Sequence, residues 1–89
     1  MNQIQASKLF NALSDPSRVN IVKELYHNET FYVGQLLEMV KIGQSTLSYH
    51  LSLLYESGLL SYKKVGKKVY YYCNRDLVDS LFNYISKKN

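Results

Sequence analysis

The stretch that decides the fold covers residues 43–58 and reads GQSTLSYHLSLLYESG. Within it, Leu47, Leu51 and Leu54 recur at the spacing of one α-helical face and form an apolar stripe. The other positions carry small polar groups instead of the lysines and glutamates typical of a solvated helix. They are Gln44, Ser45, Thr46, Ser48, Tyr49, His50 and Ser52. Small neutral donors and acceptors suit a helix that reads base edges in a groove. For this segment alone, an ordinary polar surface helix is the alternative.

Length and composition describe one small domain over residues 1–89. Hydrophobic residues make up 46% of the chain, which is enough for a core. A chain of this size buries only about 60–65% of its unfolded surface, so pairing with a second copy would help it. The first ten residues contain no apolar run typical of a signal peptide or membrane span, and a single cysteine excludes an internal disulfide framework. We therefore expect a cytoplasmic protein without a membrane partner.

The positive charge of the chain is concentrated in one region. Positions 41 to 68 contain five lysines and one acidic residue. The resulting net charge of +4 equals that of the whole chain. These lysines are Lys41, Lys63, Lys64, Lys67 and Lys68. A basic patch confined to one region is typical of a protein that binds a polyanion. A basic surface that serves only solubility is the weaker interpretation, because it would have no reason to be localised.

The residues before this stretch predict three further helices. The first covers about 3–13. The second begins after Asp15, because Pro16 disfavours the helical conformation at the residue before it and suits the first position of a helix. A short third helix is expected at about 33–40, joined to the polar helix by a tight turn. Two short helices joined in this way form a helix-turn-helix at about 33–57, a pattern typical of DNA-binding proteins.

The pattern after residue 58 changes to that of strands and then returns to a helix. Residues 59–65 and 69–73 are rich in β-prone side chains, and Gly66 lies in the short loop between them. They predict a β-hairpin, a wing, at about 59–74. Residues 75–88 predict a last helix with a broad apolar stripe. Because a small core has little use for apolar stripes at both ends of the chain, we expect the first and last helices to meet a second copy. The residues of this predicted dimer interface are Ile4, Leu9, Phe10, Leu13, Leu77, Leu81, Phe82 and Ile85.

The predicted fold is mainly α with a two-stranded β-hairpin, in the order of a winged helix-turn-helix domain. Three segments carry a closer likeness: LSDPSRVNIVKEL at 13–25, VGQLLEMVKIGQSTLSYHLSLLYESGLL at 33–60 and VGKKVYYYCN at 65–74. By these segments, their order and their spacing, the chain resembles the ArsR-type (ArsR/SmtB-like) transcriptional regulators over nearly its full length.

This resemblance implies a homodimer that is joined through the first and last helices, binds a palindromic double-stranded DNA operator and represses transcription. The tip of the wing, with Gly66 and Lys63, Lys64, Lys67 and Lys68, would approach phosphates or the minor groove. The positions that match the recognition helix are Gln44, Ser45, Ser48, Tyr49 and His50. Two interpretations of His50 stay open: it contacts DNA, or it packs against the neighbouring helix.

Departures from the family pattern concern metals and the cysteine. Where metal-sensing members often carry a Cys-x-Cys pair, the matching positions are Tyr32 and Gly34, and the last helix has no histidine to complete a site with its aspartates. We therefore expect no metal site and no cofactor. Cys73 shares a predicted strand face with Val69 and Tyr71, which favours a small, inert, buried side chain. A redox switch through a bridge between the Cys73 residues of two copies is the alternative.

The leading hypothesis is a sequence-specific, dimeric DNA-binding repressor. One alternative is a winged-helix protein-interaction module, which a neutral or acidic wing would have favoured. Others are a non-specific nucleic-acid-binding protein and an RNA-binding one, although RNA modules usually present stacking aromatics on a sheet face. An enzyme is not expected, because the sequence shows no nucleophile–base pair, paired carboxylates or glycine-rich phosphate loop.

Overall fold

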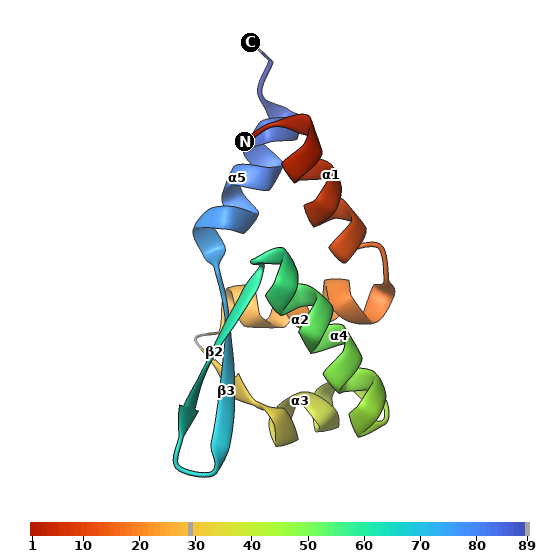
Figure 1. Ribbon diagram of the computed structural model, residues 1–89, viewed down its shortest axis with the longest axis vertical. Coiled ribbons are helices and arrows are strands. Elements are labelled where there is room, and N and C mark those ends of the chain that lie inside the picture. The colour runs from red at the N-terminus through yellow and green to blue at the C-terminus, as the bar shows by residue number, and fades with distance from the viewer. Residues whose placement is uncertain (29, 89) are drawn as a thin grey trace.

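The computed structural model describes residues 1–28 and 30–88, which form five helices and a three-stranded sheet in a body of 46 × 22 × 19 Å (Figure 1). This is the winged helix-turn-helix order that the sequence predicts, with one additional strand. The elements are α1 (Gln3–Ala12), α2 (Pro16–His27), β1 (Phe31–Tyr32), α3 (Val33–Val40), α4 (Gln44–Ser57), β2 (Leu60–Val65), β3 (Lys68–Cys73) and α5 (Arg75–Ser86).

The start of α2 is set by the two residues that the sequence singles out. Asp15 is the N-cap, and its Oδ1 accepts hydrogen bonds from the backbone N–H groups of Ser17 at 2.8 Å and Arg18 at 3.3 Å. Burial raises the pKa of the Asp15 carboxyl. These hydrogen bonds and nearby positive charge together lower it by a larger amount, so this pKa lies below its ordinary value. Pro16 occupies the first helical position, where a missing N–H costs nothing.

Left-handed backbone conformations end α3 and α4. Lys41, the C-cap of α3, has a φ of 54°, and it is the only residue other than glycine with a positive φ among those described. Gly58, the C-cap of α4, has a φ of 89°. A side chain in this region normally costs free energy, so Gly58 suits its position, whereas Lys41 is strained at the turn between α3 and α4.

The sheet has the strand order β1-β3-β2, and both pairs are antiparallel. The hairpin of β2 and β3 confirms the predicted wing, but β1 is an addition: Phe31 pairs with Tyr71, and Tyr32 with Tyr70. Next to this strand, the hydroxyl of Thr30 donates a hydrogen bond to the carbonyl of Tyr71 at 2.8 Å. A two-residue strand is too short to show an alternation of apolar and polar side chains in the sequence. Its pairing depends on where the folded hairpin of β2 and β3 lies.

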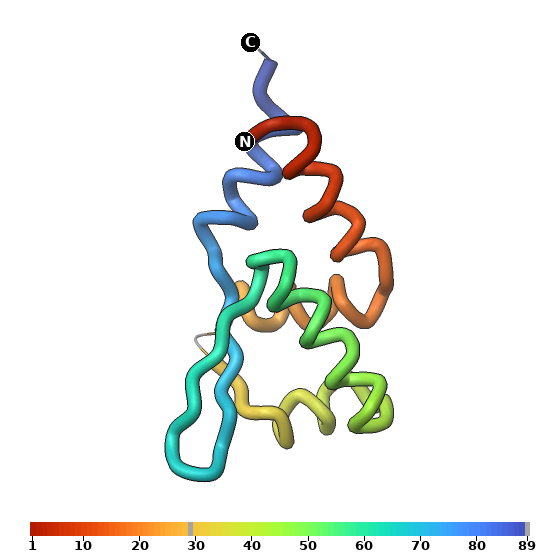
Figure 2. Tube along the Cα trace, viewed as in Figure 1, coloured from red at the N-terminus to blue at the C-terminus, as the bar shows by residue number. Residues whose placement is uncertain are grey.

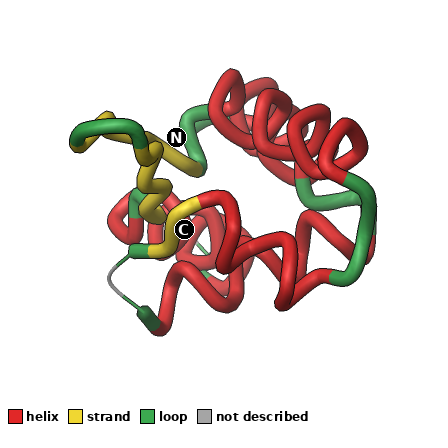
Figure 3. The backbone as a smooth tube through the Cα atoms, turned by 90° about the horizontal axis from the view of Figure 1, so that it is seen from below, coloured by secondary structure: helices red, strands yellow, loops and turns green. Residues whose placement is uncertain are grey.

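One hydrophobic core holds the helices together, and the wing projects from it. In Figure 2 both termini lie at the end of the molecule formed by α1 and α5, while α3, α4 and the wing lie toward the other end. The view in Figure 3 shows the strands to one side of the helices. The apolar stripe of α4 faces the core, as predicted. The buried residues are Ala6, Leu9, Ala12, Ile21, Val22, Leu25, Leu36, Leu47, Leu51, Leu54, Leu59, Leu60, Val78 and Leu81.

Candidate nucleic-acid interface

The outer face of the first two turns of α4 consists of small polar side chains and one exposed phenol. Its apolar stripe is buried, so the remaining face of the helix is turned to solvent. Tyr49 is the largest side chain on this face and is 60% exposed. Five of the six predicted recognition residues are exposed: Gln44, Ser45, Thr46, Ser48 and Tyr49. They present amide, hydroxyl and phenol groups, which donate and accept hydrogen bonds without carrying charge.

His50, the sixth predicted recognition residue, does not belong to this face. It is only 7% exposed, and its Nδ1 lies 3.0 Å from a guanidinium nitrogen of Arg18 on α2. The structure therefore favours the interpretation of His50 as a residue that packs against a neighbouring helix over the prediction that it contacts DNA. The physical reason is the helical period, which carries the position after Tyr49 onto the flank that packs against α2.

The wing presents its lysines at the tip and on both faces of the hairpin. Lys63 pairs with Tyr70 and Lys64 with Val69, so these adjacent lysines lie on opposite faces. Gly66 and Lys67 form the turn, with a φ of 62° at the glycine. The ammonium group of Lys68 lies 4.3 Å from the centroid of the Tyr32 ring, a cation–π contact that holds this lysine against the sheet. All four lysines and Gly66 are exposed.

Asn74 joins the wing to the end of α4. Its backbone N–H donates to the carbonyl of Leu59 at 2.9 Å. Its side-chain amide donates to the carbonyl of Gly58 and exchanges hydrogen bonds with the Ser61 hydroxyl. These bonds tie the end of β3 to the chain between α4 and β2. Sequence reasoning assigned Asn74 no role; an amide residue directly after a strand was the signal available.

Aromatic contacts reinforce the same junction. The rings of Tyr55 on α4 and Tyr62 on β2 have centroids 5.0 Å apart, and those of Tyr62 and Tyr71 on β3 are 5.6 Å apart. Lys64 shares its strand face with Tyr62, so it lies on the side of the wing that faces α4. These contacts hold α4 and the wing in one relative placement, and Figure 1 shows the two elements side by side.

A family model described as "Bacterial regulatory protein, arsR family" matches residues 15–62, which cover α2, the helix-turn-helix and the first part of the wing. The chain belongs to the ArsR family. The HTH-type transcriptional regulator MJ1325 of Methanocaldococcus jannaschii is 30% identical over 83 residues, which are 93% of each chain. The arsenical resistance operon repressor of Bacillus subtilis is 35% identical over 74 residues, 83% of this chain and 70% of that protein.

A solved structure shares the fold of this chain over nearly its full length. Reduced HlyU from Vibrio cholerae aligns with a TM-score of 0.79 and 27% sequence identity, over 97% of this chain and 94% of that one. The two curated relatives are named as a transcriptional regulator and a repressor, and the chain is an ArsR-family transcriptional regulator. Among the described residues, no helix is long and apolar enough to cross a membrane.

The positions that match the Cys-x-Cys pair of metal-sensing ArsR members are built for packing. Tyr32 lies beneath Lys68 and in edge contact with Tyr70, at a centroid distance of 6.0 Å. A Cβ atom at Gly34 would lie 2.8 Å from the Tyr32 ring, so a cysteine there would have to displace that ring. Within residues 1–28 and 30–88, no group of three or more His, Cys, Asp or Glu side chains is placed to hold a metal ion.

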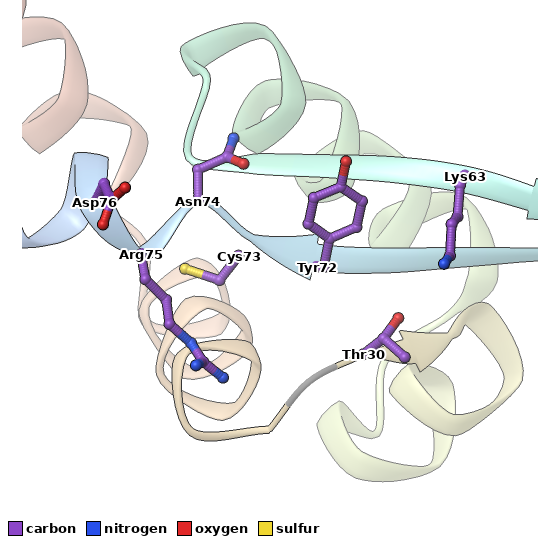
Figure 4. A pocket seen from close by; sticks show the side chains of 7 residues that line it. All are labelled: Thr30, Lys63, Tyr72, Cys73, Asn74, Arg75 and Asp76. Carbon is purple, nitrogen blue, oxygen red and sulfur yellow. The ribbon is translucent and has the colours of Figure 1, made fainter.

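Cys73 lines an open hollow of about 650 Å³ beside the wing of this ArsR chain. Figure 4 shows its thiol and the Arg75 side chain on the side of β3 that faces α2. The thiol is half-buried, and burial raises its pKa, an effect to which Asp79 adds and which Arg75 partly offsets. A raised pKa leaves less thiolate, so this environment favours the inert interpretation of Cys73. The hollow is lined by Thr30, Lys63, Tyr72, Cys73, Asn74, Arg75 and Asp76.

The residues of the predicted dimer interface divide into two groups. Leu9 and Leu81 are fully buried inside the chain itself, because the helix stripe that carries them faces this chain's own core, and neither is open to a second copy in this structure. Ile4, Phe82 and Ile85 are 72%, 55% and 64% exposed.

The remaining three residues of the predicted interface lie between these extremes. Phe10 is exposed, and its ring is in edge contact with that of Phe82 at a centroid distance of 6.5 Å. Leu13 and Leu77 are partly buried against the core.

Proposed function

We propose that this ArsR-family regulator binds double-stranded DNA in a sequence-specific way and represses transcription by occupying its operator. One observation carries the proposal: the neutral polar face of α4 and the lysines of the wing are tied to one another by the Asn74 junction. A helix in the major groove reads base edges through neutral donors and acceptors, and lysines contact phosphates irrespective of sequence. Such a regulator acts where the chromosome is, which supports the expected cytoplasmic location.

We infer that the roles within this surface are divided by chemistry. Ser48 and Tyr49 lie at the centre of the exposed face of α4 and are the side chains best placed to read bases, flanked by Gln44, Ser45 and Thr46. Lys64 and Lys67, on the α4-facing side and at the tip of the wing, would bind phosphates. Lys63 and Lys68 lie on the other face and would contribute to the wider positive field.

We further propose that the protein acts as a homodimer on a palindromic operator. The support is an apolar surface at the α1–α5 end, made by Ile4, Phe10, Phe82 and Ile85. A groove of about 400 Å³, lined mainly by apolar side chains but also by Lys23, His27 and Asp79, continues this surface. Burying it against a second copy would remove these side chains from water and place two α4 helices for major grooves about 34–36 Å apart.

We propose that no metal controls this regulator, although the Bacillus subtilis relative is named for arsenical resistance. The chain contains one cysteine and two histidines, and one of those histidines, His50, is buried against Arg18. Tetrahedral zinc or arsenic sites need several thiolate or imidazole ligands in one place. The side chain of Tyr32, where a ligand would be expected, takes part in packing.

The test begins with a defined DNA. The protein is used to enrich a 30-base-pair duplex from a random-sequence pool; this selected duplex is compared with a scrambled duplex of the same composition. Salt titrations of binding are then recorded for the wild type, Lys67→Ala, Ser48→Ala and Tyr49→Ala. Lys8→Ala, which removes an exposed lysine from α1, is the matched control for lost charge.

The variants should separate the two kinds of contact. Because a dimer loses two phosphate contacts, Lys67→Ala should reduce the slope of log K against log salt by about 1.8 and weaken both duplexes alike. Ser48→Ala and Tyr49→Ala should cost about 1–3 kcal/mol per half-site on the selected duplex, little on the scrambled one, and leave the slope intact. Lys8→Ala should change neither the salt slope nor the affinity for either duplex. If the α4 variants weaken binding to both duplexes equally, the chain is a non-specific DNA-binding protein. If the wild type does not bind DNA, a protein-interaction module is the better hypothesis.

A further inference from the structure

His50 makes a directional contact that connects the recognition helix to α2. An arginine side chain donates hydrogen bonds and accepts none, so Nδ1 of His50 must be the acceptor for the guanidinium of Arg18 at 3.0 Å. This hydrogen bond therefore requires the tautomer whose proton is on Nε2. That nitrogen lies 3.8 Å from Oδ1 of Asp15, the N-cap of α2.

Arg18 connects three helices through this contact. Its Nε donates a hydrogen bond to the carbonyl of Ala12, the last residue of α1, at 2.8 Å. Its own backbone lies in the first turn of α2, and its guanidinium meets the inner flank of α4. On α4, His50 directly follows Ser48 and Tyr49, the residues proposed to read bases. The Arg18–His50 contact therefore lies on the part of α4 that carries the proposed reading face.

We propose that Arg18 and His50 are a positioning pair whose hydrogen bond holds α4 in the orientation that reads DNA, and that protonation of His50 breaks this bond. The proposal rests on the DNA-binding function proposed above. A protonated imidazole carries N–H groups at both nitrogens, so Nδ1 would present a donor and a positive charge to the Arg18 guanidinium. The partner that remains attractive is the Asp15 carboxylate.

Among the described residues, the charged groups in contact with the imidazole are Arg18 in the first turn of α2 and Asp15, the N-cap of that helix. The pKa of Asp15 lies below its ordinary value, so this carboxyl stays ionised in mild acid. Acidification then exchanges the partner of His50: the neutral imidazole accepts from Arg18, and the imidazolium pairs with Asp15. The recognition helix loses its link to the arginine that also binds the end of α1.

Mild acid should change the affinity for the preferred DNA sequence in the opposite direction to the change that added positive charge alone would cause. Mild acid adds positive charge to a protein, which strengthens binding to DNA irrespective of sequence. Release of the positioning pair instead weakens binding to the preferred sequence alone. The chain has two histidines, and the other, His27, is exposed at the end of α2 and provides a matched control. Histidines are the side chains whose unperturbed charge changes between pH 5 and 8.

The experiment measures affinity for the selected and scrambled duplexes by fluorescence anisotropy at pH 7.5, 6.5 and 5.5 and constant ionic strength. The proteins are the wild type, His50→Asn and His27→Asn. An asparagine at position 50 can present an amide oxygen to Arg18 and does not titrate. Far-UV circular dichroism at each pH reports the folded fraction.

For the wild type and His27→Asn, affinity for the selected duplex should fall about tenfold per half-site from pH 7.5 to 5.5, as expected when each protomer loses one hydrogen bond to a charged group. Affinity for the scrambled duplex should not fall. His50→Asn should bind the selected duplex at pH 7.5 nearly as the wild type does and show no fall in acid. A fall that persists in His50→Asn, or affinities for the two duplexes that rise together in acid, would overturn the proposal.

Nitrogen-15 NMR of the histidines in the free protein tests the pair without DNA and without a variant. At pH 7.5 the Nδ1 signal of His50 should be that of an unprotonated nitrogen, and a protonated Nδ1 would refute the pairing. This measurement separates the two proposals. If the protein enriches no duplex, the DNA-binding function fails, whereas the NMR result still decides whether the Arg18–His50 pair exists.

Discussion

Gly58 ends α4 and leads into the wing, and replacing it with alanine tests how this junction is held. Its φ of 89° lies in the left-handed region, where an alanine costs about 1–2 kcal/mol. A Cβ atom would also lie 3.3 Å from Cδ2 of Leu77. Because that atom is the end of a leucine side chain, a shift of a few tenths of an ångström relieves the contact, and the backbone conformation supplies most of the cost.

Gly58→Ala should therefore lower the free energy of unfolding by about 1–2 kcal/mol, and the melting temperature by about 5–15 °C for a domain of this size. The assay is urea denaturation followed by circular dichroism, at one protein concentration because association would add to apparent stability. Gly58→Asn is the matched control: it adds a Cβ at the same place, but asparagine tolerates the left-handed region better, so it should cost less than alanine. A Gly58→Ala protein as stable as the wild type, or an asparagine variant less stable than the alanine one, would refute this reasoning.

Three further predictions concern other features of the chain. Lys41→Gly should raise the free energy of unfolding by about 0.5–1 kcal/mol in the same assay, because glycine relieves the positive φ at the end of α3. Sedimentation at micromolar concentration should show about twice the chain mass of 10.4 kDa, and Phe82→Asp should give a monomer; a monomeric wild type would remove the two-groove binding hypothesis. Since burial raises the pKa of the Cys73 thiol, its alkylation by iodoacetamide at pH 8 should be slower than that of free cysteine, with the rate rising only at higher pH, and a faster reaction would reopen a redox role.

Local rules in the sequence determined the elements of this protein. The leucine spacing of residues 47–54 is enough to define α4 and its buried side, because helical period and burial of apolar side chains act within a few turns. Asp15 and Pro16 specify the start of α2 through backbone geometry and one N-cap. The hairpin follows from two β-prone runs and a glycine between them. The localised lysines indicated a polyanion partner before any fold was known.

The tertiary structure alone decided what the side chains of those elements meet. The apolar stripes of α1 and α5 do not reveal which of their residues face this chain's own core; packing buried Leu9 and Leu81 and left Ile4, Phe82 and Ile85 at the surface. His50 borders both the polar and the packed sides of α4, and the position of α2 determined which side it joined.

The difference between local rules and tertiary contacts also explains why strand β1 and the Asn74 junction were not predicted from the sequence. Strand β1 is too short to carry a pattern, and Asn74 acquires its role only because β3 returns beside Gly58 and Ser61. Periodicity and capping depend on neighbours within about four positions, so a sequence displays them directly. A contact across 16 or 32 positions, such as Asn74 with Gly58 or Arg18 with His50, exists only once the whole chain has folded, because folding is what brings its two partners together.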